Sequence, residues 1–119
     1  MKWRFHHRKT GVYFYQLGIN RRINTLRKNY LIDNIKFNAN DVVIDCGANN
    51  GDFSLCFDKN IKYYGIEPSP IVFSNLEYNV KNKKLINKCL WKNSEDKIPF
   101  YLSDEGGDSS IIPISNYTK

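Results

Sequence analysis

The sequence predicts an α/β fold built on an open, largely parallel β-sheet. Two short apolar runs, 42–45 and 62–67, each end in an acidic residue, and a stretch of helical periodicity follows the second run. Glycines lie directly after the first run. Strands that alternate with helices are joined by right-handed crossovers and pair in parallel. At 119 residues, the chain has the length of one domain.

The first part of the chain predicts a single helix. Residues 1–18 are basic and aromatic and have no clear period. Apolar residues then recur at helical spacing, which places them on one face: Ile19, Ile23, Leu26 and Tyr30. We predict a helix over 20–33 and a turn at 38–41.

The central part predicts two buried strands and the helices that follow them. The β-branched run 42–45 lies between turn signals, as expected for a buried parallel strand. A short helix is predicted over 51–58, and the second strand covers 62–67. Ser69 is suited to cap a helix and Pro70 to occupy its first position, so we predict a helix from there to about residue 81.

The last part predicts two further strands. Residues 84–91 predict a third core strand, and 92–96 a turn. Residues 98–103 predict a fourth strand at a sheet edge, because Pro99 cannot donate a hydrogen bond to a neighbouring strand. A loop at 104–110 and a short extended piece at 111–115 complete the chain.

The basic charge is concentrated in the N-terminal segment. Residues 1–40 hold nine Lys and Arg against one Asp, a net charge of +8, and because the whole chain carries +6 the remainder carries −2. Such asymmetry is typical either of a solvated helix face or of a surface that binds anions such as RNA. No apolar run reaches the roughly 18 residues that a membrane span needs. Together with the free thiols described next, this predicts a cytoplasmic protein.

The cysteines predict neither a disulfide framework nor a metal site. Their number is odd and no CxxC spacing occurs among them: Cys46, Cys56 and Cys89. We expect them to be free thiols in a reducing compartment.

The loop after the first strand carries the features of a cofactor site. In open parallel sheets, ligands bind beyond the carboxyl ends of the strands. Gly47 and Gly51 allow the backbone to turn and to approach a ligand closely. Glu67 ends the second strand 20 residues after Gly47, where a carboxylate can accept both hydroxyls of a ribose. These residues predict a nucleoside-containing cofactor.

The glycine spacing and one acid favour a cationic cofactor. The dinucleotide fingerprint is G-x-G-x-x-G, whereas this loop reads G-x-x-x-G, and its third glycine would fall at Asp52. Asp45, two residues before Gly47, would repel a pyrophosphate. S-adenosylmethionine carries an ammonium and a sulfonium beside its ribose, so we expect S-adenosylmethionine rather than NAD.

The motifs resemble those of a known enzyme family. "DCGANNGDFSL" is similar to the first motif of class I S-adenosylmethionine-dependent methyltransferases, and "GIEPSPIVFSNLEYNV" to the second. With "GGDSSI" after a strand, the order resembles FkbM-type methyltransferases, mostly O-methyltransferases of glycan and secondary-metabolite pathways. The resemblance covers roughly residues 40–112. It implies a Rossmann-like methyltransferase domain at 39–119, preceded by a basic arm and helix at 1–38.

The resemblance also implies roles for individual residues. The cofactor would be bound by the glycine loop and by the ends of the second and third strands: Asp45, Gly47, Ala48, Asn49, Gly51, Glu67, Pro68, Ser69 and Leu90. Trp91 would lie beside the adenine with Leu90. Asp108, Ser109 and Ser110 would line the acceptor side. No residue is implied as general base, and no metal is implied.

The family sheet has seven strands, of which the chain supplies the first three and an added edge strand. We therefore expect the N-terminal part of a methyltransferase that acts on a glycan or small metabolite. The first strand would then expose an unpaired apolar edge, through which the chain could self-associate. Two alternatives stay open: a non-catalytic cofactor-binding remnant that needs a partner chain, and an RNA methyltransferase that grips RNA with its basic arm.

Overall fold

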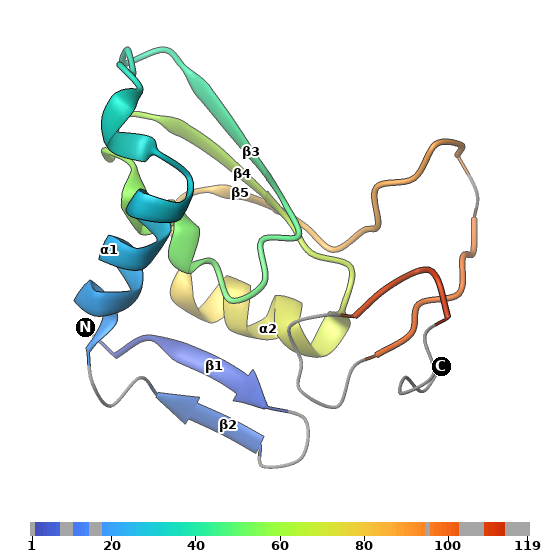
Figure 1. Cartoon of the computed structure of the whole chain (residues 1–119). Coiled ribbons are helices and arrows are strands. Elements are labelled where there is room, and N and C mark those ends of the chain that lie inside the picture. The colour runs from blue at the N-terminus through green and yellow to red at the C-terminus, as the bar shows by residue number, and fades with distance from the viewer. Residues whose placement is uncertain (1, 8–10, 15–17, 95, 103–108, 114–119) are drawn as a thin grey trace.

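A three-stranded parallel sheet forms the centre of the protein (Figure 1). The computed structural model describes residues 2–7, 11–14, 18–94, 96–102 and 109–113. The strands are β3 (Val42–Cys46), β4 (Lys62–Ile66) and β5 (Lys84–Ile86), in the order β3-β4-β5. This small α/β arrangement is compatible with part of a Rossmann-like sheet, as the sequence predicted.

The helices lie on one face of this sheet (Figure 1). They are α1 (Ile19–Asn29), α2 (Pro70–Asn79) and two 3-10 turns, η1 (Ile32–Asn34) and η2 (Asp52–Cys56). The predicted start of α2 is confirmed, because the Ser69 hydroxyl accepts from the backbone N–H of Val72 at 3.4 Å and Pro70 follows the cap. In the part of the chain that the structure describes, neither helix is long and apolar enough to cross a membrane.

An N-terminal hairpin packs against α2, which lies between the hairpin and the sheet (Figure 1). Strands β1 (Arg4–His7) and β2 (Gly11–Phe14) pair antiparallel. The sequence did not predict them, because each strand has only four residues and residues 1–18 show no alternation. Contacts with α2, rather than local propensity, hold the hairpin in place.

The N-terminal residues share the hydrophobic core with the rest of the chain. One cluster joins Trp3 to Ala48, Leu76 and Val80, all buried. A second cluster consists of side chains from α1, η1 and η2: Leu26, Ile32 and Cys56. Residues 1–38 and the sheet region are therefore packed around common clusters.

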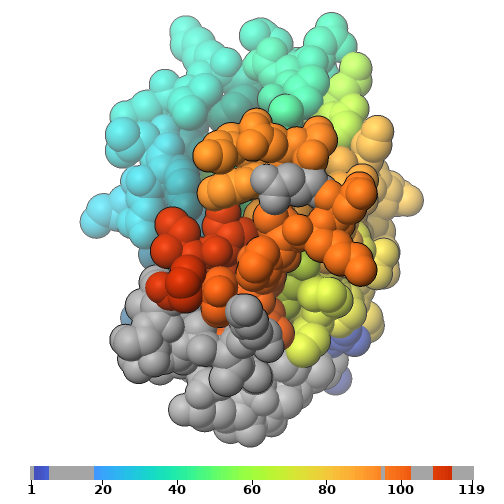
Figure 2. All heavy atoms as spheres, turned by 90° about the vertical axis from the view of Figure 1, so that its right-hand side faces the viewer, coloured from blue at the N-terminus to red at the C-terminus, as the bar shows by residue number. Residues whose placement is uncertain are grey.

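The opposite face of the sheet is only partly covered. The described residues of the orange and red segment, 90–94, 96–102 and 109–113, cover the middle of the side of the molecule that Figure 2 shows, which is the right-hand side of Figure 1. Val42 and Ile44 of β3 remain 52% and 62% exposed, and among the described residues no strand pairs with the outer edge of β3. Parallel sheets normally have both faces buried. The unpaired apolar edge of β3 agrees with the sequence prediction, but the prediction of a buried strand at 42–45 is wrong for Val42 and Ile44, because no described segment covers this face of β3.

Two predicted helices differ from the observed ones. The helix predicted over 20–33 ends at Asn29, because Leu31 adopts a left-handed conformation with φ of 53° and a 3-10 turn follows. The helix predicted over 51–58 is the five-residue 3-10 turn η2.

The third strand is shorter than predicted. The strand predicted over 84–91 ends at Ile86. The side-chain amide of Asn87 donates to the backbone carbonyls of Glu67 and Pro68, at 2.8 and 3.2 Å, where a continued strand would pair through its backbone.

The predicted edge strand at 98–103 does not join the sheet. In its described part, Tyr101 instead exchanges two backbone hydrogen bonds with Ser110, at 2.7 and 3.0 Å, in an isolated antiparallel bridge. Pro99 has no N–H with which to extend the pairing. Residues 111–113 form no strand either, whereas 103, 114 and 115 lie outside the described residues.

Candidate functional site

The glycine loop is fastened to the end of β4 through its own backbone. The N–H groups of Gly47 and Ala48 both donate to the carbonyl of Ile66, each at 2.9 Å. The N–H of Asn49, whose φ is 49°, donates to Oε2 of Glu67 at 3.0 Å. These bonds join the carboxyl ends of β3 and β4, and they leave these amides already paired before any ligand arrives.

The two loop glycines differ in what surrounds them. Gly47 has a φ of 82°, and a Cβ added there would meet no atom within 4 Å. Gly51 has a φ of 85°, and its Cβ would lie 2.4 Å from Cγ2 of Val80 and 2.6 Å from Cδ1 of Leu76. Gly47 therefore leaves open space beside the loop, whereas Gly51 permits the close approach of α2.

Glu67 is a buried carboxylate at the end of β4. Glu67 is only 7% exposed. Its two carboxylate oxygens accept hydrogen bonds from the backbone N–H groups of Ser69, at 2.8 Å, and Asn49, at 3.0 Å. Burial raises the pKa of Glu67, the two backbone hydrogen bonds oppose that rise, and the nearby charge of Asp45 adds to it. Each oxygen keeps a second lone pair that can accept a ligand hydroxyl.

The carboxylate of Asp45 accepts a hydrogen bond on the helix-covered side of the sheet. The hydroxyl of Tyr63 donates to Oδ2 of Asp45 at 2.5 Å. Burial raises the pKa of Asp45, the Tyr63 hydrogen bond opposes the rise, and Asp52 adds to it. The pKa of Tyr63 is raised too, by burial and by Asp45, so its hydroxyl keeps its proton and continues to donate.

A pocket of about 310 Å³ opens beside Gly47, at the carboxyl ends of β3 and β4. We call it the strand-end pocket. Five residues predicted for the site line it: Gly47, Pro68, Leu90, Ser109 and Ser110. Residues that the sequence did not indicate complete its wall: Cys46, Ile66, Lys88, Cys89, Phe100 and Ile111. The structure thus brings the start of the glycine loop together with both later segments that the motifs had indicated.

Other predicted site residues support the pocket without lining it. Ala48 is buried in the core cluster of Trp3, and Ser69 caps α2. Asp45, Asn49, Gly51 and Glu67 hold or shape the loop, as described above. Trp91 is 43% exposed and does not line the strand-end pocket. Asp108 lies outside the described residues.

Two asparagines of α2 hold the loop from the helix side, and the sequence analysis assigned them no such role. Asn75 is fully buried; its amide donates to Oδ1 of Asn50 at 3.3 Å, and its oxygen accepts from Nε of Arg4 at 2.5 Å. Asn79 donates to the backbone carbonyls of Asn50 at 2.8 Å and Arg4 at 2.5 Å, and accepts from the N–H of Arg4 at 2.8 Å. The sequence held one signal for this role: two asparagines four residues apart on a helix face that is otherwise apolar and buried, where polar side chains need hydrogen-bond partners.

Several arginines of the basic N-terminal segment pair with acceptor groups of the same chain. Nε of Arg22 pairs with the buried Asp52 at 2.6 Å. Arg27 pairs with Asp33 and donates to the carbonyl of Cys56 at 2.7 Å. Together with Arg4, these guanidinium groups are structural contacts between the N-terminal segment and the rest of the molecule.

Comparison with known proteins gives no relative. No family model matches the chain, and no curated protein or solved structure matches it either.

Proposed function

We propose that the chain is the cofactor-binding part of an S-adenosylmethionine-dependent methyltransferase of the FkbM type, which methylates a hydroxyl of a glycan or small metabolite. The observation that supports this most directly is that the buried Glu67 carboxylate and the open backbone of Gly47 occur together at the carboxyl ends of β4 and β3. Both lie at adjacent strand ends, beside the strand-end pocket.

The strand-end pocket and the neighbouring Glu67, which lies between the lining residues Ile66 and Pro68, together offer the contacts that an adenosine moiety needs. The free lone pairs of the Glu67 carboxylate would accept the ribose hydroxyls. Ile66, Leu90 and Phe100 provide apolar surface on which the adenine would pack. The open space at Gly47 would let the methionine part of the cofactor pass close to the backbone.

The loop is suited to a cation and poorly suited to a pyrophosphate. A dinucleotide site presents unpaired backbone N–H groups to phosphate, whereas those of Gly47, Ala48 and Asn49 already donate within the chain. Asp45 and Glu67 are near enough for the charge of one to raise the pKa of the other. Two adjacent carboxylates attract an ammonium or sulfonium and repel a phosphate.

When bound, S-adenosylmethionine supplies an activated methyl group for attack by the acceptor oxygen. Ser109 and Ser110, which line the strand-end pocket together with Gly47, are our candidates for the acceptor side. The main contribution of the chain would be to position the two reactants. We assign no general base.

The RNA-binding alternative is less well supported. It relies on the basic N-terminal segment, yet Arg4, Arg22 and Arg27 are engaged with acceptors of the same chain. The alternative of a cofactor-binding remnant differs from our proposal only in activity, so the first test is binding.

Calorimetric titration of the full chain with S-adenosylmethionine, S-adenosylhomocysteine and NADH tests the proposal. We expect saturable binding of the two sulfur compounds and none of NADH. Glu67→Gln should weaken binding by about tenfold, because a charged acceptor of a ribose hydroxyl is lost. Glu77→Gln, a change at an exposed position on α2, is the matched control and should leave affinity unchanged. Absence of binding, or equal affinity of the Glu67→Gln variant, would refute the proposal.

A further inference from the structure

A groove of about 590 Å³ lies at the amino ends of β4 and β5. It is formed by the turn that precedes β4, by the segment that precedes β5, and by the first residues of both strands, Lys62 and Lys84. We call it the lysine groove. The strand-end pocket lies at the opposite end of β4 and shares no lining residue with it. A ligand of the lysine groove would therefore bind independently of the proposed cofactor.

The lysine groove gathers positive charge. Four lysines line it, Lys59, Lys62, Lys83 and Lys84, and no described acidic residue lines it. None of these lysines forms an ion pair with a described acidic residue. Like charges gathered in one concave site repel each other, and a bound anion would relieve that repulsion.

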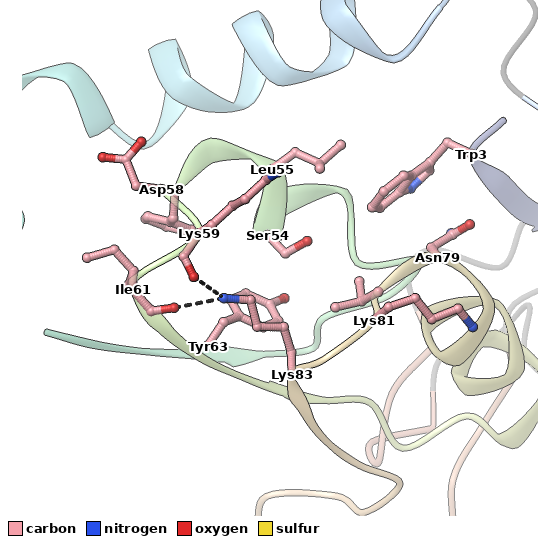
Figure 3. Close-up of a pocket in the computed structure, with 12 residues that line it drawn as sticks. Trp3, Ser54, Leu55, Asp58, Lys59, Ile61, Tyr63, Asn79, Lys81 and Lys83 are labelled. Atoms are coloured by element: carbon pink, nitrogen blue, oxygen red, sulfur yellow. Dashed lines mark hydrogen bonds between the residues drawn. The ribbon is translucent and has the colours of Figure 1, made fainter. Parts of the chain in front are cut away.

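The acidic residues next in sequence to the groove do not neutralise it. Asp58 turns its carboxylate away from Lys83 (Figure 3). The carboxylate of Asp41 accepts from the backbone N–H of Asn38 at 2.8 Å. The charge of the groove is thus left for a ligand to balance.

Lys83 is held in a fixed position at the groove. Its Nζ donates to the backbone carbonyls of Lys59 and Ile61, at 3.1 and 2.9 Å (Figure 3). These two bonds tie the segment before β5 to the turn before β4. The position of this cation is therefore set before a ligand arrives, which lowers the entropy lost on binding. The side chains of Lys59, Lys62 and Lys84 are exposed and can adjust to the ligand.

The two tyrosines of the groove do not present an open ring for base stacking. Tyr63 is 3% exposed, and its hydroxyl donates to Asp45. Nζ of Lys84 lies over the ring of Tyr64, 5.6 Å from its centroid. Proteins that hold single-stranded nucleic acid combine a basic groove with aromatic rings on which bases stack. The lysine groove therefore suits a ligand that is recognised by its charge alone.

We propose that the lysine groove binds a compact anion that carries several phosphate groups in a row, an oligophosphate. An ammonium is a point charge with rotatable donors, so several lysines can contact phosphate oxygens without a fixed geometry. The side-chain amides of Asn60 and Asn82, which also line the groove, add hydrogen-bond donors. The volume of the groove lies within the range of small-molecule sites.

The test is a titration of the ¹⁵N-labelled full chain with sodium tripolyphosphate, followed by NMR. We expect saturable movement of the backbone amide resonances of residues 59–62 and 82–84. The affinity should fall as the salt concentration rises, because the attraction acts between solvent-exposed charges. Saturating S-adenosylmethionine should leave the titration unchanged, so this proposal and the proposed function can fail separately.

Charge-matched variants separate the groove from the net charge of the chain. Lys59→Gln and Lys62→Gln should each weaken tripolyphosphate binding by about threefold, the effect of losing one exposed ion pair. The double variant should weaken it by about tenfold if the two effects add. Lys28→Gln removes the same charge from an exposed position of α1 outside the groove and should leave the affinity unchanged.

Three results would overturn the proposal. Unmoved amides at 59–62 and 82–84 would show that the groove does not bind the anion. Equal weakening by Lys28→Gln would show that only net charge attracts it. Tighter binding of single-stranded oligouridylate than of tripolyphosphate, at equal phosphate concentration, would assign the groove to RNA instead.

Discussion

Gly47 and Gly51 have nearly the same positive φ, 82° and 85°, but different surroundings. A side chain at Gly47 would enter open space, whereas one at Gly51 would overlap Leu76 and Val80 of α2. The spacing of the two glycines in the sequence indicated a ligand loop for both. The structure leaves that role open to Gly47 and gives Gly51 a packing role.

We predict that Gly51→Ala lowers the free energy of unfolding by about 3 kcal/mol, since left-handed strain and overpacking act together. Gly47→Ala should cost about 1 kcal/mol from strain alone. Urea denaturation of both variants measures the difference. Equal losses would contradict the distinction between the two glycines.

Asp45 should make stability depend on pH in an unusual direction. Burial raises its pKa above the ordinary value of 3.8, so the folded chain holds this proton more tightly than the unfolded chain does. The contribution of Asp45 to the free energy of unfolding is therefore greatest below pH 3.8 and falls as pH rises through the raised pKa. Asp45→Asn removes this ionisation and keeps an oxygen for the Tyr63 hydroxyl.

We accordingly expect Asp45→Asn to be more stable than the parent near neutral pH, with the difference vanishing below the ordinary pKa of the carboxyl. Urea midpoints measured across this range provide the test. Tyr63→Phe is a useful companion, because loss of the hydrogen bond should steepen the fall in stability with pH. Parallel curves for Asp45→Asn and the parent would contradict the assignment.

At the scale of elements, the glycine loop is fixed between β4 and α2. Its backbone bonds to Ile66 hold it to the sheet, and Asn75 and Asn79 hold it to the helix. The same asparagines hold Arg4 of β1. The hairpin and the loop are thereby coupled through one face of α2.

We predict that Asn79→Ala lowers the free energy of unfolding by about 2–3 kcal/mol, because backbone groups of Arg4 and Asn50 lose their partner. Amide hydrogen exchange should become faster in β1 and in residues 49–51 together. Glu77→Ala, at an exposed position of the same helix, should change neither quantity. Faster exchange in β1 alone would show that the loop does not depend on Asn79.

At the scale of the whole molecule, the uncovered sheet face is the main departure from a usual parallel α/β fold. Val42 and Ile44 are exposed, and no described strand pairs with the outer edge of β3. Such an edge offers both apolar surface and unpaired backbone groups to another chain.

We therefore expect the isolated chain to self-associate through β3, with a sedimentation coefficient that rises with protein concentration. Ile44→Lys should reduce this association. Ile71→Lys is the matched control, because Ile71 is 44% exposed on α2, away from this edge. A parent chain that stays monomeric and unfolds cooperatively would contradict the prediction.

The sequence by itself determined the parallel strands, the capped start of α2 and the placement of Gly47 and Glu67 at adjacent strand ends, since these follow from local periodicity and turn chemistry. Only the tertiary structure decided the hairpin, the early end of β5 and the packing role of Gly51. It also decided the pairing of Arg4, Asn75 and Asn79 and the gathering of four lysines in one groove. Each of these depends on contacts between segments distant in the chain, and neither periodicity nor propensity carries that information.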